Sequence, residues 1–387
     1  MLAASYPGYR AFLRDADDPR KALDRVWREL WWQIEKAPFW RERMGEPGRR
    51  TPPLSAFPVT DYGTYREALE ASYRGRVSEL SGDPIRAFAK RPGVHGPPLP
   101  ISDRSRAHDR RALGVYLHTL ARRYRGVLRR PVLYVPGRIE RSPAGLDVAL
   151  PGDDELRHAP VSLRRHFAAP LEVFCAGEGG ASCAAAYALA GDLSAILGAS
   201  AATVAAFVGR MLTGLRDIWP LLTGRERPPP ELPPVAASRE RLAHLKRALA
   251  REPLSLKEVW PGLQLVCTAP GPGDGAARST LEELSQGRVP ILEAGAVGAE
   301  GRVAVPDAAG GRSAVLHPGA HAVEFLPEGA EPAARNLLQA PELEPGETYA
   351  PVVSTAAGLV RCRLEVRARC QGWVLRSPTL SFEPLSG

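Results

Sequence analysis

Residues 263–295 read LQLVCTAPGPGDGAARSTLEELSQGRVPILEAG. The apolar run 263–269 predicts a buried strand, 276–286 predicts a helix, and 289–295 predicts a second strand. A strand-helix-strand unit of this length joins two parallel strands of one sheet, with the helix lying across its face. This stretch therefore predicts an α/β protein.

The same alternation extends upstream to residue 170. LEVFCAG (171–177) and LSAILGAS (193–200) predict strands, and helices are expected around 181–190, 202–223 and 238–251. The proline-rich segment 225–235 is expected to be a linker. After residue 300 short alternating segments predict hairpins. We therefore expect mixed sheets packed with helices, followed by a β-rich C-terminal part.

The first third of the chain predicts helices separated by loops. Residues 20–44 form a helical pattern whose aromatic face carries Trp27, Trp31 and Trp32. Tryptophans at this spacing are more often core residues than a ligand platform. Thr60 and Asp61 are good cap residues for a short helix. Segment 86–102 is expected to be a loop, and helix 104–125 leads to a strand in RPVLYVPG (130–137).

Composition and charge narrow the classes of function. The 387 residues are 44% hydrophobic and 24% charged, with a net charge of +8. Arginines gather in 104–130 and 157–165, where the first cluster is the solvated face of an amphipathic helix. No nucleic-acid-binding signature accompanies them, so no nucleic-acid partner is expected. No stretch reaches 18 apolar residues, and five cysteines without a CxxC pattern indicate free thiols, so a cytoplasmic protein without membrane contact is expected.

Within the opening stretch, a glycine pattern offers a different function. Gly271, Gly273 and Ala276 stand as in a dinucleotide-binding turn, and Glu293 closes the next strand. Pro272 removes an amide from a loop that works through its amides, which argues against that function.

Two histidines four residues apart raise the question of a metal site. His317 and His321 belong to HPGAH, in which Pro318 and Gly319 prevent a regular helix. A metal-binding pair on one helix face is therefore not expected.

Residues 294–307, AGAVGAEGRVAVPD, hold one acid, Glu300, between glycines just before a strand. Two interpretations are open. Glu300 is a catalytic carboxylate on a shaped loop, or it is a solvated turn residue.

Five segments, taken in order, resemble one family. They are FPVTDYGTYREAL (57–69), WPGLQLV (260–266), VPILEAGAVGAEGRVAVPD (289–307), AVEFLPEG (322–329) and LEPGETYAPVVSTAAGLVRCRL (343–364). They resemble the Gretchen Hagen auxin-responsive promoter family, the acyl-acid amido synthetases of plants and their bacterial relatives. This family belongs to the adenylate-forming superfamily.

The resemblance implies a fold, a reaction and a set of site residues. Such enzymes use ATP and Mg²⁺ to activate a carboxylic acid as an acyl-adenylate, and then transfer the acyl group to an amine. Glu300 would be the catalytic residue and the Mg²⁺ ligand. The nucleotide would be bound by Gly93, Gly96, Gly298, Ala299, Glu300, Gly301, Thr355 and Arg363.

The chain departs from the family pattern at several positions. The expected phosphate loop, 89–100, has no serine or threonine and is rich in proline, which lacks an amide donor. Lys90 and Arg91 lie on the wrong side of this loop to replace its lysine simply. Ala299 stands where a hydroxyl residue is expected, Val366 where a ribose-binding aspartate is expected, and Leu385 where a hinge arginine is expected.

These departures lead to a prediction for the whole chain. Residues 1–385 are expected to form an adenylate-forming-like large domain without a C-terminal lid. Its expected subdomains are 1–165 plus 238–300, 166–237, and the β-rich 301–385. The predicted function is that of a binding or accessory protein with an impaired ATP site, whose partner is a small carboxylic acid, an acyl group or a protein. The alternative is an active ATP-dependent ligase.

Overall fold

The computed structural model describes residues 2–45, 48, 50–91, 96–150, 152–159, 161–175, 177–235, 237–251, 254–269, 274–295, 297–307 and 313–384. The chain divides into two compact units. Unit 1 comprises Met1–Leu120, Arg138–Glu155 and Ala294–Gly387, and unit 2 comprises Ala121–Gly137 and Leu156–Glu293. The units are bounded differently from the subdomains expected from the sequence. Residues 238–293 lie with 166–237 in unit 2, and the strands after 300 share unit 1 with the N-terminal helices.

Unit 2 is built on the predicted parallel sheet. Its strands run in the order β3-β6-β7-β8, and every neighbouring pair is parallel. The bounds are β3 Val132–Val135, β6 Ala195–Gly198, β7 Leu265–Thr268 and β8 Ile291–Glu293. All four residues of β7 are buried, as expected for a parallel strand with both faces covered. The α/β class predicted from residues 263–295 is confirmed.

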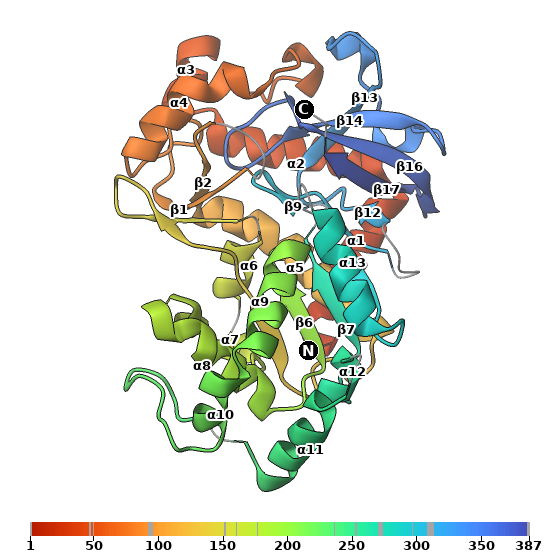
Figure 1. Ribbon diagram of the computed structural model, residues 1–387. Helices are drawn as coiled ribbons and strands as arrows, with labels where there is room; N and C mark the ends of the chain where they lie inside the picture. Colours follow the sequence, from red (N-terminus) through yellow and green to blue (C-terminus); the bar gives the residue numbers. More distant parts are fainter. Residues whose placement is uncertain are drawn as a thin grey trace. The chain divides into compact units, whose positions relative to one another are not determined.

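Helices of unit 2 connect these strands and cover the sheet (Figure 1). Their bounds are α7 Val161–Arg164, α8 Gly177–Ala190, α9 Ala201–Thr213, α10 Leu215–Leu222, α11 Arg239–Leu249, α12 Leu256–Val259 and α13 Asp274–Ser285, with the 3₁₀ helix η2 at Leu171–Cys175. Trp260 is fully buried in this core, and its indole Nε1 donates to Ala188 O at 2.9 Å. The helices and strands of unit 2 therefore share one hydrophobic core.

Unit 1 contains the β-rich part predicted after residue 300. A seven-stranded antiparallel sheet has the order β11-β12-β17-β16-β14-β13, with β15 paired to β14. The bounds are β11 Ala304–Pro306, β12 Ala314–Leu316, β13 Ala322–Pro327, β14 Thr348–Ser354, β15 Cys362–Arg363, β16 Val366–Val374 and β17 Ser377–Pro384. Short 3₁₀ helices, η3 at Ala334–Asn336 and η4 at Ala340–Glu342, precede β14.

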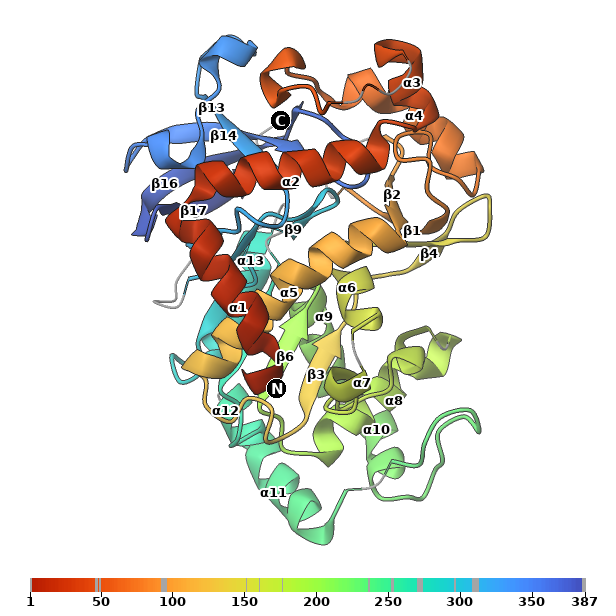
Figure 2. The same ribbon diagram turned by 180° about the vertical axis from the view of Figure 1, so that it is seen from behind.

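Helix α2, Pro19–Ile34, lies across this sheet (Figure 2). Helix α1, Leu2–Asp17, precedes it in the chain, and α3, Pro38–Met44, follows it away from the sheet. Trp27, Trp31 and Trp40 are buried in one cluster with Leu359 and Cys362, whereas Trp32 is 70% exposed. The aromatic face of α2 is therefore core, as predicted, with Trp32 outside it.

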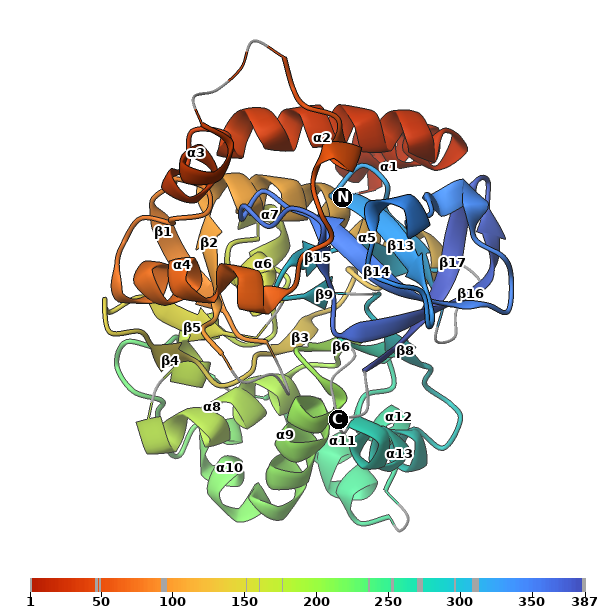
Figure 3. The ribbon, with the colours of Figure 1, turned by 90° about the horizontal axis from the view of Figure 1, so that it is seen from above.

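A second sheet of unit 1 lies next to α4, Tyr62–Arg74 (Figure 3). Its order is β2-β1-β5-β4, with bounds β1 Ile85–Ala89, β2 Leu99–Ser102, β4 Glu140–Arg141 and β5 Asp147–Ala149. The remaining elements are η1 Leu54–Ala56, α5 Asp103–Arg123, α6 Asp153–Arg157 and the hairpin strands β9 Val297–Gly298 and β10 Gly301–Arg302. Asp61 caps α4, accepting from Thr64 N at 3.0 Å, as predicted.

The structure corrects four local predictions. The expected loop 86–102 contains the paired strands β1 and β2, and the expected strand in 171–177 is the 3₁₀ helix η2. Helix 20–44 is interrupted before Pro38, because proline removes an amide and restricts the residue before it. Helix 202–223 is divided at Gly214 into α9 and α10.

Candidate functional site

Glu300 lies on a tight hairpin turn. Strands β9 and β10 pair Gly298 with Gly301 and Val297 with Arg302, so Ala299 and Glu300 form the two-residue turn. A side chain at position 298 would overlap Glu300 Oε2, which shows that the carboxylate folds back over its own hairpin. Four predicted nucleotide-binding residues, 298–301, are therefore together in one turn.

Two polar side chains of unit 1, Asp109 and His321, pack against this turn. Gly301 has φ +121°, and a Cβ there would overlap His321 Nε2 and lie 2.6 Å from Asp109 Oδ1. Asp109 accepts from the backbone N–H of Arg302 at 3.3 Å and lies 3.4 Å from His321 Nε2. Only glycine fits this position, because both the backbone conformation and the space require the absence of a side chain.

The Glu300 carboxyl has few groups that favour its charged form. Burial raises its pKa to about 7, and repulsion from Glu365 adds to this effect. A hydrogen bond from its own backbone N–H opposes the shift. Neighbouring Ala299 offers no hydroxyl and packs against the aromatic cluster. Glu300 therefore titrates near neutral pH rather than remaining fully ionised.

The other predicted site residues are dispersed over unit 1. Thr355 is buried after β14, and its Oγ1 has no hydrogen-bond partner among the described residues. Arg363 is exposed on β15. Gly96 lies against the guanidinium of Arg91. Gly93 lies outside the described residues, as do Leu385 and the glycines 271 and 273.

Arg91 is a charged residue that was not predicted to belong to the site, because it lies on the wrong side of the expected phosphate loop. Its guanidinium stacks on the Tyr62 ring with Cζ 3.8 Å from the ring centroid. Nε and Nη1 are buried and have no hydrogen-bond partner in the described part of the chain. Burial lowers the pKa of Arg91, and the nearby Glu365 partly offsets this effect. Arg91 also lines a pocket of about 510 Å³ with Gly96, Pro97 and Pro98.

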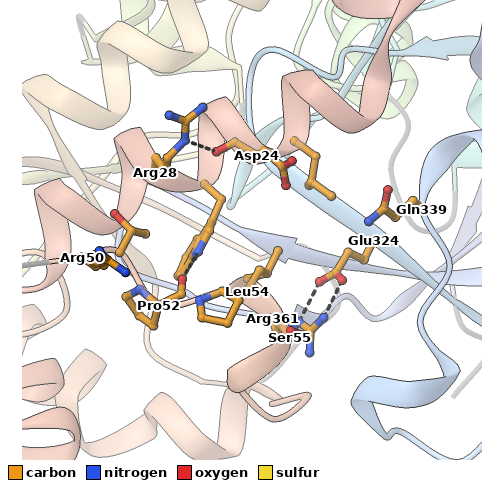
Figure 4. Close-up of a pocket in the computed structure, with 13 residues that line it drawn as sticks. Asp24, Arg28, Arg50, Pro52, Leu54, Ser55, Glu324, Gln339 and Arg361 are labelled. Carbon is orange, nitrogen blue, oxygen red and sulfur yellow. Dashed lines mark hydrogen bonds and ion pairs between the residues drawn. The ribbon is translucent and has the colours of Figure 1, made fainter.

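A second pocket, of about 540 Å³, lies between α2 and residues 50–55 (Figure 4). Trp27 forms part of its wall and donates from Nε1 to Pro52 O at 2.8 Å. Glu324 and Arg361, which also line it, form a buried bidentate pair with distances of 2.8 and 2.6 Å. None of the predicted site residues lines this pocket.

Three buried histidines lie together in unit 1. His108 Nδ1 lies 3.1 Å from Ala320 O, and its ring stacks 6.3 Å from that of His321. His317 Nδ1 accepts from Gly319 N–H at 3.2 Å. Burial lowers the pKa of His108 to about 4 and that of His317 to about 3. No group of three His, Cys, Asp or Glu side chains among the described residues is arranged to hold a metal ion.

The donor groups do not fit magnesium ATP held in the manner that the sequence resemblance implies. Mg²⁺ prefers ionised carboxylates and phosphate oxygens in octahedral geometry. Among the described residues, no group of three His, Cys, Asp or Glu side chains is placed to hold the ion together with Glu300. On the described side of the phosphate loop, Pro97 and Pro98 supply no amide donors.

Solved structures define the class of fold. The chain is similar to AtGH3.15 acyl acid amido synthetase in complex with 2,4-DB, with a TM-score of 0.78 and 16% identity over 97% of this chain and 69% of that one. It is also similar to 2-hydroxyisobutyryl-CoA ligase in complex with 2-HIB-AMP and CoA, with a TM-score of 0.56 and 13% identity over 96% of this chain and 69% of that one. The fold is that of the adenylate-forming enzymes.

Sequence comparison finds similarity to one family over part of the chain. Residues 314–384 match the GH3 family central domain. A human GH3 domain-containing protein is 35% identical over 155 residues, which are 38% of this chain and 29% of that protein. The predicted resemblance to the GH3, or Gretchen Hagen, family is confirmed over these residues. The matched stretch spans less than a third of the human relative.

No helix among the described residues is both long and apolar enough to span a bilayer. The buried cysteines Cys183, Cys362 and Cys370 are free thiols, as expected from the absence of a CxxC pattern. Cys267 is buried as well.

Proposed function

We propose that this chain is a GH3-related binding or accessory protein that recognises a small carboxylic acid or acyl group and does not adenylate it. The observation that supports this proposal best is the described side of the expected phosphate loop, where Pro97 and Pro98 supply no amide donors. The phosphate groups of ATP are bound by backbone amides and hydroxyls of such a loop. A carboxylic acid without phosphate groups does not need them.

Similar proteins indicate the class of ligand. The solved relatives are described with 2,4-DB and with 2-HIB-AMP, which are a carboxylic acid and an acyl-adenylate. Binding the acid does not require the phosphate groups of ATP, whereas forming the acyl-adenylate does. A pocket lined with apolar side chains and a few charged groups, as in unit 1, suits such a ligand.

Thermal unfolding tests this proposal, because a ligand that binds only the native state raises its melting temperature. We expect 2,4-DB or 2-hydroxyisobutyrate to raise the melting temperature in a concentration-dependent manner. We expect millimolar ATP with Mg²⁺ to leave it unchanged. Stabilisation by magnesium ATP, together with no response to either acid, would contradict the proposal.

One observation favours the alternative of an active ligase. The Glu300 turn is intact, and Gly301 is held in a position that only glycine fits. An active enzyme would show acid-dependent exchange of pyrophosphate into ATP, and Glu300→Ala would abolish it. The proposal predicts no exchange with either acid for the wild-type chain and for Glu300→Ala alike.

A further inference from the structure

The net charge of +8 is carried almost entirely by unit 2. This unit holds 20 lysines and arginines against 13 aspartates and glutamates, a formal charge of +7, whereas unit 1 holds 31 against 30. A concentration of charge of one sign steers the association of a protein with partners of the opposite sign. The exposed cations of unit 2 therefore define a candidate interaction surface.

The arginines of α5 and of the turn after it divide into two groups. Arg104, Arg106 and Arg111 form ion pairs with acids of unit 1. Arg125 and Arg129 belong to unit 2, are exposed, and have no ion pair among the described residues. Acids of the chain therefore neutralise the first group but not the second.

A tight turn after α5 holds Arg125 and Arg129. The backbone N–H of Arg129 donates to Gly126 O at 2.8 Å. Gly126 has φ +103°, and a Cβ there would lie 3.5 Å from Arg129 Cδ and 3.4 Å from Gln264 Nε2. The Arg129 stem therefore packs over the turn, beside residue 264, while the residue remains exposed.

Two further cations lie beside the turn that precedes β7. The Arg130 side chain crosses Gly262 so closely that a Cβ on residue 262 would be 2.7 Å from Arg130 Cδ. Lys257 Nζ donates to Leu263 O at 2.7 Å. Because Arg129 packs beside the same turn, three cations are gathered around it.

Two acids pair with this group of cations. Asp192 pairs with Arg130. Glu258, the neighbour of Lys257 in α12, lies 2.9 Å from Arg251 Nη1 and 3.8 Å from Arg288 Nη1. Six cations and two carboxylates leave an excess of four positive charges. We call this surface the basic face, and it consists of Arg125, Arg129, Arg130, Arg251, Lys257 and Arg288.

The basic face lies at the edge of the parallel sheet where the strands begin. Its residues come from the segments before β3, β7 and β8. These strands are parallel, so their first residues share one edge, and α11 and α12 lie at this end of unit 2 (Figure 2). Small ligands of open α/β sheets bind at the opposite edge, outside the carboxyl ends of the strands. The basic face is therefore separate from the place where this sheet would bind a small molecule.

The composition of the basic face suits the carboxylates of a protein better than a nucleic acid or a bilayer. Five of its six cations are arginines, whose planar guanidinium groups match carboxylates through paired hydrogen bonds. None of the large apolar side chains that are exposed among the described residues belongs to it. Nucleic-acid bases would therefore find no aromatic platform there, and a bilayer would meet no apolar anchor.

From these observations we infer that the basic face of unit 2 is the docking surface for an acidic protein, whose aspartate and glutamate side chains pair with Arg125 and Arg129. The inference goes beyond the proposed acid-binding function and does not depend on it, because it concerns a macromolecular partner and unit 2 alone.

Fluorescence anisotropy with labelled poly-L-glutamate as the probe tests this surface. We expect the wild-type chain to bind the probe at about 50 mM salt and to lose affinity at about 300 mM, because salt screens exposed charges. Arg125→Glu/Arg129→Glu should weaken binding about tenfold or more, since it places carboxylates where those of the probe would pair. Arg125→Gln/Arg129→Gln should weaken binding to a smaller extent.

The matched control is Arg14→Glu/Arg66→Glu, which changes the net charge equally at exposed arginines of unit 1. This control should change the dissociation constant less than about twofold, because its charges are screened from the basic face. Equal weakening by the two glutamate variants, or no binding of the probe by the wild-type chain at the lower salt concentration, would overturn the docking surface. Tighter binding of poly-uridylate or of phosphatidylserine vesicles, lost in Arg125→Glu/Arg129→Glu, would overturn the choice of an acidic protein.

Thermal unfolding distinguishes lost contacts from lost structure. Arg125 and Arg129 are exposed, so both of their double variants should melt within about 2 °C of the wild-type chain. A much lower melting temperature of both variants, with unchanged binding by the folded fraction, would give the two arginines a structural role and overturn the inference.

Discussion

Glu324 and Arg361 show how one buried ion pair can organise several segments. Arg361 is 2% exposed and Glu324 is 6% exposed. Arg361 also donates from Nη1 to Phe57 O at 2.9 Å, and its backbone N–H donates to Ser354 Oγ at 2.9 Å. The pair therefore connects β13, the end of β14 and the segment before α4.

Removing one member of this pair should be costly. Glu324→Ala leaves the Arg361 guanidinium without its carboxylate, and we expect a loss of about 3–5 kcal/mol in the free energy of unfolding. Urea denaturation with linear extrapolation measures this loss. Replacing both residues by methionine should recover part of it, because no buried charge remains.

Glu331→Ala is the matched control, since Glu331 pairs with Arg335 on the surface, where the two side chains are 68% and 73% exposed. Its loss should not exceed about 1 kcal/mol. Equal losses for Glu324→Ala and Glu331→Ala would show that the buried pair does not organise these segments.

The hairpin of β9 and β10 is the element that carries Glu300, the predicted catalytic residue. Its turn can hold Glu300 in place only while Gly301 remains close to Asp109 and His321. A substitution at Gly301 therefore tests the packing of this hairpin without changing the Glu300 carboxylate itself.

Gly301→Ala should destabilise the chain by about 1–3 kcal/mol more than Gly329→Ala. Both glycines have positive φ, +121° and +78°, but a Cβ at 329 meets nothing within 4 Å. The difference between the two unfolding free energies reports the overlap with His321 and Asp109 together with the greater backbone strain of alanine at φ +121°. Equal losses for the two variants would show that Asp109 and His321 can move away from residue 301 without a cost in stability.

At the level of elements, the sequence predicts periodic segments well and short irregular ones poorly. The parallel strands around β7 are strongly apolar, and helix α5 is long. The structure confirms both the strands and the helix. Strands β1 and β2 are short and next to a proline-glycine segment, so turn residues hide their pairing. Segment 171–175 is apolar, and periodicity alone cannot distinguish a strand from a 3₁₀ helix over five residues.

The candidate site was predictable only where residues adjacent in sequence form it. Residues 298–301 make one turn, so a local motif identifies them together. Arg91 and Tyr62, or Glu324 and Arg361, meet only through the fold. No spacing in the sequence indicates that Arg91 lacks partners, because that property depends on which groups the tertiary structure brings to it.

For the whole molecule, the buried histidines predict a dependence of stability on acid. His317 and His108 have pKa values of about 3 and 4 in the folded chain, against about 6.5 when unfolded. Between these values the unfolded chain binds more protons, so stability falls as pH falls from about 6.5 to about 4. Glu29, which lies 3.6 Å from His108 Nε2, reduces this effect for His108 but does not reverse it.

Chemical denaturation between pH 7 and pH 4 measures this dependence. In His317→Gln the slope of unfolding free energy against pH should decrease by up to about 1.4 kcal/mol per pH unit. An unchanged slope in His317→Gln would show that this imidazole is protonated in the folded chain.

The aromatic face of α2 has a consequence for how the chain is made. Some of its partners follow at once, since Phe57 and Trp40 contact Trp27 and Trp31. Others lie near the other end of the sequence, because Leu359 and Cys362 belong to the same cluster. At roughly 5–20 residues per second, synthesis leaves this face without those C-terminal partners for some 15–60 seconds. All four strands of unit 2 are complete before they emerge. A nascent chain must keep the partly covered face of α2 from aggregating throughout that interval.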